Sequence, residues 1–412
     1  MIAIGIIGYG TVGSGVYEVI QTNKESIAKR AGEEIIVKRI CDLREFPGDP
    51  AEQLLTKDFK ELAEDPEIRI IVETMGGVQP AYDYVKMALE HGKSVCTSNK
   101  ELVARHGSEL LAIAKERSLN FLFEASVGGG IPIIRPLNQA LTADEIVEIK
   151  GILNGTTNYI LTKMTREGAE YEDVLREAQE KGYAERNPEA DVEGHDACRK
   201  IAILTSLAYG SQVDYEDIHT EGITHITKED IAYAKAMDAG IKLLGSSKRQ
   251  YAEGSCGMQE SKIYAQVAPV LVKSDHPLYG VNDVFNAIFV KGNVLGEVMF
   301  YGRGAGKLPT ASAVVSDVID AVKHKNTNIM TLWSSKKLEL GCFEDSSSRF
   351  FVRVPEAEQG QAQELFHAEG FQEVKAEGVT GEYAFLTGTL TEREYEKKTQ
   401  ALSVLNRIRV AF

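Results

Sequence analysis

The sequence predicts an α/β protein with a doubly wound parallel sheet at the N-terminus, an α+β block in the middle and a βαββαβ unit of ferredoxin-like type at the C-terminus. Short apolar runs alternate with amphipathic helical segments from residue 1 to about 130, which is typical of a parallel sheet with crossover helices. A glycine-rich stretch at 126–133 marks a boundary. Residues 349–412 then follow the order strand, helix, strand, strand, helix, strand.

The N-terminal domain is expected to span 1–133, and 303–330 is expected to return to it. Its strands are predicted as short apolar runs that stop at turn residues, because strands of a parallel sheet are buried on both faces. These runs are 2–7, 34–42, 68–77, 94–100 and 120–125, and helices are predicted at 12–20, 82–93 and 109–118.

The middle block, 134–302, is expected to bind substrate, carry the catalytic groups and form the dimer contact. We predict a helix near 135–142, a strand at 145–153, longer helical stretches to about 210, and strands at 262–272 and 285–292. Residues 301–322 read as a Gly-rich loop followed by a helix, and the polar stretch 334–348 reads as a linker.

Composition excludes several classes of protein. The 412 residues carry a net charge of −15, which repels nucleic-acid phosphate and anionic lipid. Five scattered cysteines without metal-ligand spacing indicate reduced thiols. The first residues lack the basic start of a signal peptide, and no stretch reaches the ~18 apolar residues of a membrane span. We therefore expect a cytoplasmic protein with no nucleic-acid or membrane partner.

The segment Gly8-Tyr9-Gly10-Thr11-Val12-Gly13 follows the first strand and opens a helix. This G-x-G-x-x-G spacing gives a tight turn, close approach of a pyrophosphate to the backbone, and close packing of helix on strand. The N–H groups at the start of the helix attract the phosphates. The sequence therefore predicts a Rossmann-type dinucleotide site.

Two residues after the second strand bear on the choice of coenzyme. Asp42 could accept a hydrogen bond from an adenosine ribose hydroxyl, as in NAD-binding proteins. Arg44 and Arg39 lie nearby and could hold the 2′-phosphate of NADP, although Arg44 is equally well explained as a solvated loop charge. NAD and NADP both remain open.

Two further segments end strands of the predicted sheet. Ser98-Asn99-Lys100 follows the fourth strand, at the edge where coenzyme and substrate meet in such sheets. Glu124 precedes the glycine-rich stretch that holds Val127, Gly129 and Ile131. Its carboxylate and the bent backbone's carbonyls suit a hard monovalent cation, although a plain hinge between domains explains the glycines more simply.

The middle block holds two polar segments. The loop 154–159, which includes Asn154, Gly155 and Thr156, ends a strand and opens a helix whose N–H groups could bind a carboxylate. Asp196 and Lys200 are four residues apart and so share a helix face. A desolvated lysine held by a carboxylate is suited to proton transfer; an exposed ion pair is the simpler alternative.

Together these motifs resemble those of the homoserine dehydrogenase family, from residue 1 to about 325. The resembling blocks are GYGTVGSGV, TSNKELVA, EASVGGGIPI, ILNGTTNYIL, AERNPEADVEGHDACRKIAIL, EGIT at 221–224 and GRGAGKLPTASAV at 302–314. The resemblance implies NAD(P)-dependent interconversion of L-homoserine and L-aspartate 4-semialdehyde, in threonine and methionine biosynthesis.

The resemblance also implies roles for residues of this chain. Lys200 resembles the family's proton donor and acceptor, Asp196 its partner, and Lys100 the lysine at the junction of coenzyme and substrate. Further positions are implied in three groups. Substrate is bound by Glu185, Asp191, Asn154, Gly155 and Thr156; coenzyme by the glycine loop, Asp42, Arg44, Ser98 and Gly306; sodium or potassium by Glu124, Val127, Gly129 and Ile131.

The chain departs from the family pattern at two places. Asn187-Pro188 stands where an Asp-Pro is common, and Cys41 occupies a position before Asp42 that often holds arginine. The C-terminal unit resembles an ACT module, which in this family can bind threonine as an effector, yet its first turn reads PEAEQG. Effector binding and a purely structural or dimerising role both stay open, and the resemblance implies a homodimer or homotetramer.

Two other functions are compatible with parts of this pattern. One is a regulatory binding protein that uses the Rossmann-type and ACT-like parts as sensors and does no chemistry. The other is a dehydrogenase of a different small amino acid. The combination of Glu185, Asp196 and Lys200 favours a catalytic protein over the first alternative.

Overall fold

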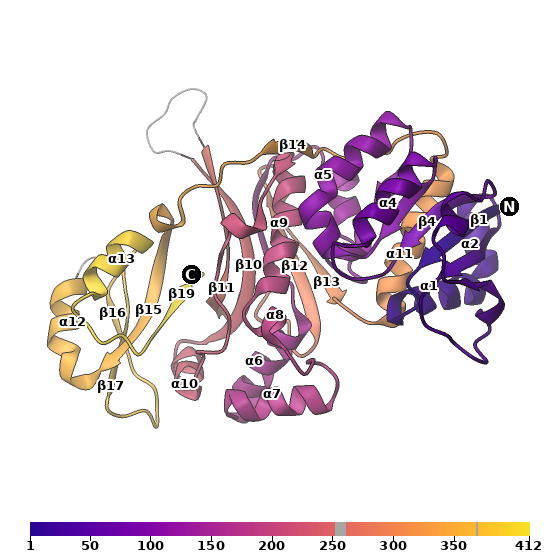
Figure 1. Ribbon diagram of the computed structural model, residues 1–412. Coiled ribbons are helices and arrows are strands. Elements are labelled where there is room, and N and C mark those ends of the chain that lie inside the picture. Colours follow the sequence, from indigo (N-terminus) through magenta and orange to yellow (C-terminus); the bar gives the residue numbers. More distant parts are fainter. Residues whose placement is uncertain (252–260, 368–369) are drawn as a thin grey trace. The chain divides into compact units, whose positions relative to one another are not determined.

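A computed structural model describes residues 1–251, 261–367 and 370–412 (Figure 1). The chain forms two compact units. The first comprises Met1–Glu145, Ala202–Tyr215 and Phe300–Leu338, and the second Ile146–Ile201, Glu216–Met299 and Glu339–Phe412. Cys256 and the end of the helix predicted near 358–370 lie outside the described residues. Among the described residues, no helix is both long and apolar enough for a transmembrane segment.

The first unit contains the predicted parallel sheet. Its strand order is β3-β2-β1-β4-β5-β6, with every neighbouring pair parallel. The order reverses between β1 and β4, so this is a doubly wound sheet whose ligand crevice lies at the carboxyl ends of those two strands. The strands are β1 (Ile2–Ile7), β2 (Ile35–Cys41), β3 (Leu55–Thr56), β4 (Ile68–Glu73), β5 (Ser94–Thr97) and β6 (Phe121–Leu122).

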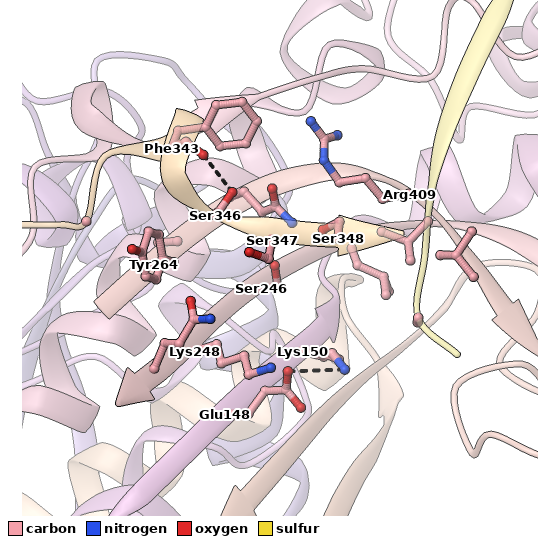
Figure 2. A pocket seen from close by; sticks show the side chains of 18 of the residues that line it. Glu148, Lys150, Ser246, Lys248, Tyr264, Phe343, Ser346, Ser347, Ser348 and Arg409 are labelled. Carbon is pink, nitrogen blue, oxygen red and sulfur yellow. Dashed lines mark hydrogen bonds and ion pairs between the residues drawn. The ribbon is translucent and has the colours of Figure 1, made fainter. Parts of the chain in front are cut away.

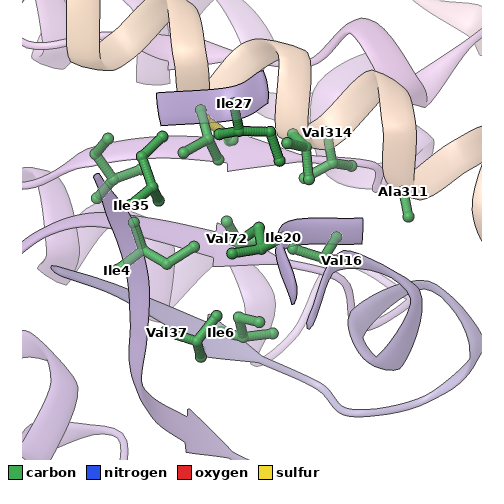
Figure 3. Close-up of a cluster of buried hydrophobic side chains, with 14 of the residues drawn as sticks. Ile4, Ile6, Val16, Ile20, Ile27, Ile35, Val37, Val72, Ala311 and Val314 are labelled. Atoms are coloured by element: carbon green, nitrogen blue, oxygen red, sulfur yellow. The ribbon is translucent and has the colours of Figure 1, made fainter. Parts of the chain in front are cut away.

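Helices cover this sheet, and one of them comes from much later in the sequence. Apolar residues of β1, α1 and α11, among them Ile6, Val16, Ile20 and Val314, form one buried cluster (Figure 3). The helices of the unit are α1 (Thr11–Thr22), α2 (Lys24–Ala31), α3 (Lys60–Ala63), α4 (Ala81–Glu90), α5 (Lys100–Glu116) and α11 (Lys307–Lys323), with a short π-helix at Pro136–Ala140. The segment 334–348, predicted as a linker, contains β14 (Ser334–Lys337), which pairs with β8 (Ser211–Gln212).

One helix of this unit begins earlier than the sequence predicted. Helix α5 begins at Lys100 rather than near residue 109, because the Asn99 side chain caps it by accepting from the Leu102 N–H at 3.1 Å. The cap places Lys100 at the first helical position, directly after β5.

The second unit is built on a long mixed sheet in the order β13-β12-β7-β10-β11-β19-β15-β17-β16. Strand β10 was not predicted, and residues 301–303, predicted as loop, complete β13. Glycine and polar residues weaken the strand signal of β10, but Gly245 is needed there, since a Cβ would lie 3.2 Å from Ile201. The strands of the middle block are β7 (Ile146–Ile152), β9 (His219–Thr220), β10 (Ala239–Tyr251), β11 (Ser261–Lys273), β12 (Phe285–Gly292) and β13 (Gly296–Arg303).

The helices that carry the polar segments of the middle block belong to this unit. The exception is the last part of α9, which belongs to the first unit from Ala202 onward. They are α6 (Gly155–Glu167), α7 (Tyr171–Glu180), α8 (Glu189–Val192), α9 (His195–Tyr209) and α10 (Lys228–Ala236). Short 3-10 helices occur at Glu52–Leu54, Glu124–Ser126, Tyr215–Asp217, Phe343–Asp345 and Glu356–Glu358.

Residues 349–412, here called the C-terminal module, show the predicted βαββαβ order. Phe350, Phe366, Phe385 and Tyr395 lie in its buried core. Strand β19 of the module pairs with β11 of the middle block, so the module extends the same sheet. Its elements are β15 (Ser347–Pro355), α12 (Gln359–Phe366), β16 (Gln372–Val374), β17 (Glu382–Leu386), β18 (Leu390–Thr391), α13 (Glu392–Thr399) and β19 (Asn406–Val410).

Candidate functional site

The glycine loop has the geometry that a dinucleotide requires. Gly8 has φ +85°, and a Cβ at Gly13 would lie 1.9 Å from the Gly8 carbonyl oxygen, so neither position accepts a larger residue without distortion. Helix α1 begins at Thr11 without a side-chain cap. Its first N–H groups therefore remain for a phosphate.

Asp42 and Arg44 form one unit beside this loop. Asp42 accepts from the Tyr9 N–H at 2.6 Å and from Arg44 Nε and Nη2 at 3.0 and 2.8 Å. The Arg44 guanidinium is the main cause that lowers the pKa of Asp42 to about 2. Asp42 is thus held ionised with its lone pairs already engaged, while most of the Arg44 side chain, 61%, is exposed.

Two functional residues at the end of β4 escaped the sequence analysis. Thr74 Oγ1 donates to the Gly8 carbonyl oxygen at 2.8 Å and so fixes the glycine loop. The carboxyl group of Glu73 is fully buried and accepts from Thr97 Oγ1 at 2.5 Å and from the Met75 N–H at 2.7 Å. Burial raises the pKa of Glu73. An acid at the end of an otherwise apolar run was the signal that could have identified it.

Glu73 and Asn99 connect this strand end to the segment Ser98-Asn99-Lys100. The Ser98 N–H donates to the Glu73 carbonyl oxygen at 3.3 Å, and Asn99 Nδ2 donates to the Gly77 carbonyl oxygen at 2.7 Å. The backbone around Lys100 is therefore anchored to the strand end beside the glycine loop. Gly306, with φ +122°, lies just before α11 in the same unit.

The Glu124 carboxylate lies buried beside the glycine-rich stretch. Its two oxygens accept from the N–H groups of Ile133, Ile134 and Arg135 at 2.6–2.8 Å. The described residues contain no group of three His, Cys, Asp or Glu side chains fit to hold a metal. The predicted monovalent-cation site combines this one carboxylate with the backbone carbonyls of Val127, Gly129 and Ile131, and it stays a prediction.

The second unit brings four predicted residues together. Lys200 Nζ donates to Asp196 Oδ2 and to the Leu153 carbonyl oxygen, each at 2.7 Å. Asn154 Nδ2 donates to Asp191 Oδ1 at 2.7 Å and to Asp196 Oδ2 at 2.9 Å. Lys200 is 9% and Asp196 5% exposed, so the pair is buried rather than an exposed ion pair.

Local structure explains how these side chains meet. Asn154 follows β7 and caps α6, accepting from the Thr157 N–H at 2.9 Å through Oδ1, which leaves its amide nitrogen to bridge the two aspartates. Asp196 and Lys200 lie one turn apart on α9. Burial, with a smaller contribution from the charge of Asp196, raises the pKa of Asp191.

Two further predicted residues differ in their relation to this network: Thr156 reaches it through a side-chain hydrogen bond with Asp191, whereas Glu185 does not belong to it. Glu185 is exposed in the turn before α8, and His195 is exposed at the start of α9. Thr156 Oγ1 donates to the Tyr183 carbonyl oxygen at 2.7 Å, which ties the start of α6 to the same turn that precedes Glu185.

A cavity of about 440 Å³ lies within the second unit (Figure 2), and Lys200 is not among its lining residues. Strands β7, β10 and β11 form one wall, and residues 340–349 and 409–412 the other. Charged groups of both signs line it, including Glu148, Lys150, Lys248 and Arg409. None of the predicted site residues lines this cavity.

A doubly wound sheet with a G-x-G-x-x-G loop, together with a buried lysine held by a carboxylate, defines an NAD(P)-dependent oxidoreductase. Family models agree: the NAD-binding domain of homoserine dehydrogenase matches residues 8–124, and the homoserine dehydrogenase model matches 132–319. The chain belongs to the homoserine dehydrogenase family, so it acts on a CH–OH group as the sequence predicted.

Individual relatives support this assignment. Homoserine dehydrogenase of Bacillus subtilis is 43% identical over 80% of this chain and 74% of that protein, and that of Synechocystis is 47% identical over 78% and 73%. The crystal structure of a homoserine dehydrogenase from Thiobacillus denitrificans matches with a TM-score of 0.88 at 35% identity, over 99% of this chain and 98% of that one. A hyperthermophilic archaeal homoserine dehydrogenase in complex with NADPH matches with a TM-score of 0.65 at 31% identity, over 78% and 97%.

We predict that Arg44→Ala shifts coenzyme preference from NADP toward NAD. Loss of charge-assisted hydrogen bonds to a 2′-phosphate costs about 1.5–3 kcal/mol, which raises KM for NADP roughly 10- to 150-fold. KM for NAD should change little, because Asp42 is released for a ribose hydroxyl. Steady-state kinetics with both coenzymes measure this, with Arg69→Ala, at an exposed arginine of β4, as a control. Equal losses with NAD and NADP would contradict the prediction.

Proposed function

We propose that Lys200 is the proton donor and acceptor when this chain interconverts L-homoserine and L-aspartate 4-semialdehyde. The observation that carries the proposal is the buried Nζ, bonded at 2.7 Å to both Asp196 and the Leu153 carbonyl. Two acceptors fix the direction of the amine, and Asp196 stabilises its charged form. One Nζ position remains for a substrate oxygen, because an ammonium has three donors.

In the oxidative direction, the neutral Lys200 amine takes the proton of the substrate hydroxyl. A bound NAD(P) would supply the acceptor for the hydride that leaves the same carbon. In the reductive direction, the Lys200 ammonium returns its proton to the oxygen of the aldehyde as the alcohol forms. Asp196 stabilises the charge on nitrogen at that stage, and no covalent intermediate is needed.

The remaining side chains are proposed to bind rather than react. Asp191 and Glu185 would attract the substrate ammonium, and the start of α6, at Asn154, Gly155 and Thr156, would bind its carboxylate. Lys100 would assist at the oxygen. The coenzyme would be held by Gly8, Gly10, Thr11, Val12, Gly13, Asp42, Arg44, Ser98, Lys100 and Gly306. A sodium or potassium ion would be held by Glu124 and the carbonyls of Val127, Gly129 and Ile131.

We predict that Lys200→Ala abolishes turnover while coenzyme binding persists. Removal of a positioned general acid and base costs about 10²- to 10⁴-fold in kcat. NAD(P)H formation with homoserine measures turnover, and NADPH fluorescence measures coenzyme binding. Lys163→Ala, which removes a partly buried lysine of α6 paired with Glu167 and Glu177 outside the proposed site, serves as a control. Activity within threefold of the parent would exclude the proton-transfer role.

We also propose that the chain forms a homodimer or homotetramer in the cytoplasm. Val294, Leu295 and Met299 are 79%, 52% and 38% exposed on the hairpin at the edge of the long sheet, and exposed apolar side chains on an edge favour a partner. The free thiols of Cys41, Cys96, Cys198 and Cys342 suit a reducing compartment. Light scattering should give a mass of about two or four chains; a monomer would refute the assembly.

The C-terminal module is proposed to bind an amino-acid effector such as threonine, in the cavity shown in Figure 2. Lys248 and Arg409 could receive a carboxylate there, and Glu148 an ammonium. Lys248→Met should weaken inhibition by threonine, whereas Lys262→Met, on β11 outside the cavity, should not. Threonine titration of the NAD(P)H assay tests this, and inhibition that is equally strong in both variants would place the effector elsewhere.

A further inference from the structure

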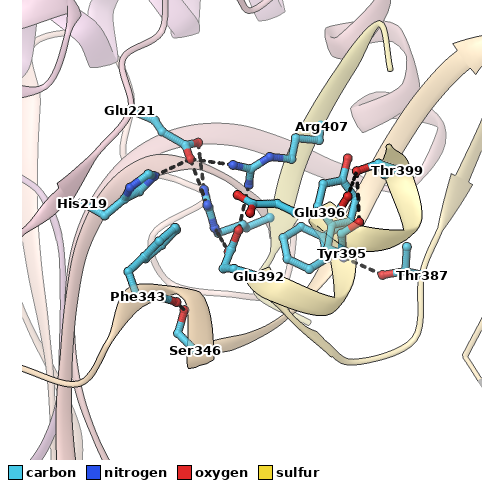
Figure 4. A network of polar contacts seen from close by, with 12 residues as sticks. His219, Glu221, Phe343, Ser346, Thr387, Glu392, Tyr395, Glu396, Thr399 and Arg407 are labelled. Carbon is cyan, nitrogen blue, oxygen red and sulfur yellow. Dashed lines mark hydrogen bonds and ion pairs between the residues drawn. The ribbon is translucent and has the colours of Figure 1, made fainter. Parts of the chain in front are cut away.

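Glu221 of the EGIT segment, which the proposed reaction does not use, lies between two arginines of the C-terminal module (Figure 4). Arg409 donates from Nη1 and Nη2 to the two Glu221 oxygens at 2.8 and 2.9 Å, and Arg407 Nη2 donates to Oε1 at 2.9 Å. Both arginines also bind Glu392, which is fully buried. Glu221 therefore joins the middle block to strand β19.

The ring of His219 completes this cluster. Its Nε2 lies 2.7 Å from Glu221 Oε1, and the ring stacks on Phe343 at 3.6 Å between centroids. Burial opposes ionisation of Glu221, but the hydrogen bonds of His219 and Arg409 and the charges of both arginines hold its pKa well below the ordinary range. Glu221 is thus a fixed anion that keeps the arginines in place.

The backbone around Glu221 is in contact with the turn between α8 and α9. The Ile223 N–H donates to the Val192 carbonyl oxygen at 2.8 Å, and the Glu221 N–H to that of Val267 at 2.8 Å. A Cβ at Gly222 would lie 2.4 Å from the Val192 oxygen, and one at Gly194 would lie 3.1 Å from Thr220. The two chain segments are in direct backbone contact, and glycine on each side permits it.

This turn determines the positions of the two aspartates of the proposed site. Asp191 lies three residues before Gly194 and Asp196 two residues after it, and the Gly194 N–H donates to the Asp191 carbonyl oxygen at 3.0 Å. Asn154 bridges both carboxylates. A shift of the turn by a few tenths of an ångström would change the distances from Asp196 to Lys200 and to Asn154.

We infer that Glu221 is a positioning residue through which the C-terminal module holds the α8–α9 turn, and with it Asp196 and Lys200, in the reactive arrangement. The inference rests on the proposed role of Lys200. It assigns the module a part in the basal reaction that does not require any effector. The Glu221 side chain touches neither Lys200 nor Asn154, so its effect passes through the backbone of 219–223.

The test compares two ion-pair anchors of the same module in the full-length chain. Glu221→Gln and Arg409→Met break the anchor at the α8–α9 turn. Arg353→Met breaks the other, in which Arg353 Nη1 donates to buried Asp230 of α10 at 2.6 Å. Each variant loses a buried pair and should lose thermal stability. Only the first two should lower kcat, by about tenfold, with NADPH binding unchanged.

Further readouts separate positioning from general damage. Glu221→Gln and Arg409→Met should shift the pH profile of kcat/KM, whereas Arg353→Met keeps the parent profile. Arg409→Lys, which retains a charge, should recover part of kcat. Rates are divided by the concentration of NADPH-binding sites, so that only folded protein is compared. If Glu221→Gln does not fold, Arg407→Met takes its place, because the Arg407 side chain is partly exposed. The expected changes in kcat and in the pH profile are the same.

Two outcomes would overturn the inference: parental kcat and pH profile in Glu221→Gln and Arg409→Met, or equal losses in those variants and in Arg353→Met. These outcomes differ from a failure of the proposed chemistry. If Lys200→Ala retains activity, the proton-transfer role is wrong regardless of Glu221. If Lys200→Ala is inactive and Glu221→Gln is fully active, only the positioning role is wrong.

Discussion

The buried amine of Lys200 is the group on which the rest of the second unit depends. A charge taken out of water must be paired and hydrogen-bonded, or it strongly destabilises the fold. Lys200 meets this requirement with one carboxylate oxygen and one strand-end carbonyl, both at 2.7 Å. The two acceptors come from α9 and from the end of β7, so helix and strand must keep their register to within a few tenths of an ångström. The same Asp196 oxygen also accepts from Asn154, which brings the start of α6 into the arrangement.

Buried acids with neutral partners perform a similar role in the first unit. Glu73 ends the central strand β4 and binds Thr97 and the Met75 N–H, and Thr74 beside it binds the glycine loop. Three loops at the carboxyl edge of the sheet are therefore fixed by one strand end. Because such groups are costly to bury without full hydrogen bonding, they keep the loops in a single conformation before coenzyme arrives. Glu124 holds the backbone of 133–135 in the same way.

Local sequence patterns predicted those features of the fold and the site that depend on residues close together in the chain. The glycine loop follows from spacing and flanking elements, and the contact of Asp196 with Lys200 follows from one helical turn. The bridge from Asn154 to Asp191 and Asp196 spans 37 and 42 residues and has no local signal. Strand β10 was missed because Gly240 and Gly245 lower strand propensity, although close approach to α9 requires the second of them. The assignment of Glu185 to the site rests on resemblance alone, and its side chain is exposed in the segment before α8.

The position of the C-terminal module in the sheet has a physical consequence that motif analysis alone does not give. Strand β19 pairs with β11, and Arg353, Arg407 and Arg409 all form ion pairs with acids of the middle block. Arg409 is 2% exposed and pairs with Glu221 of the middle block, so separating the module would break this ion pair together with the pairing of β19 and β11. Module and middle block are therefore expected to unfold together. The arginines of β19 hold Glu221, and the backbone next to Glu221 contacts the turn before α9, where the Ile223 N–H donates to the Val192 carbonyl oxygen. The ion pairs that hold the module in place therefore lie against the turn that is flanked by Asp191 and Asp196.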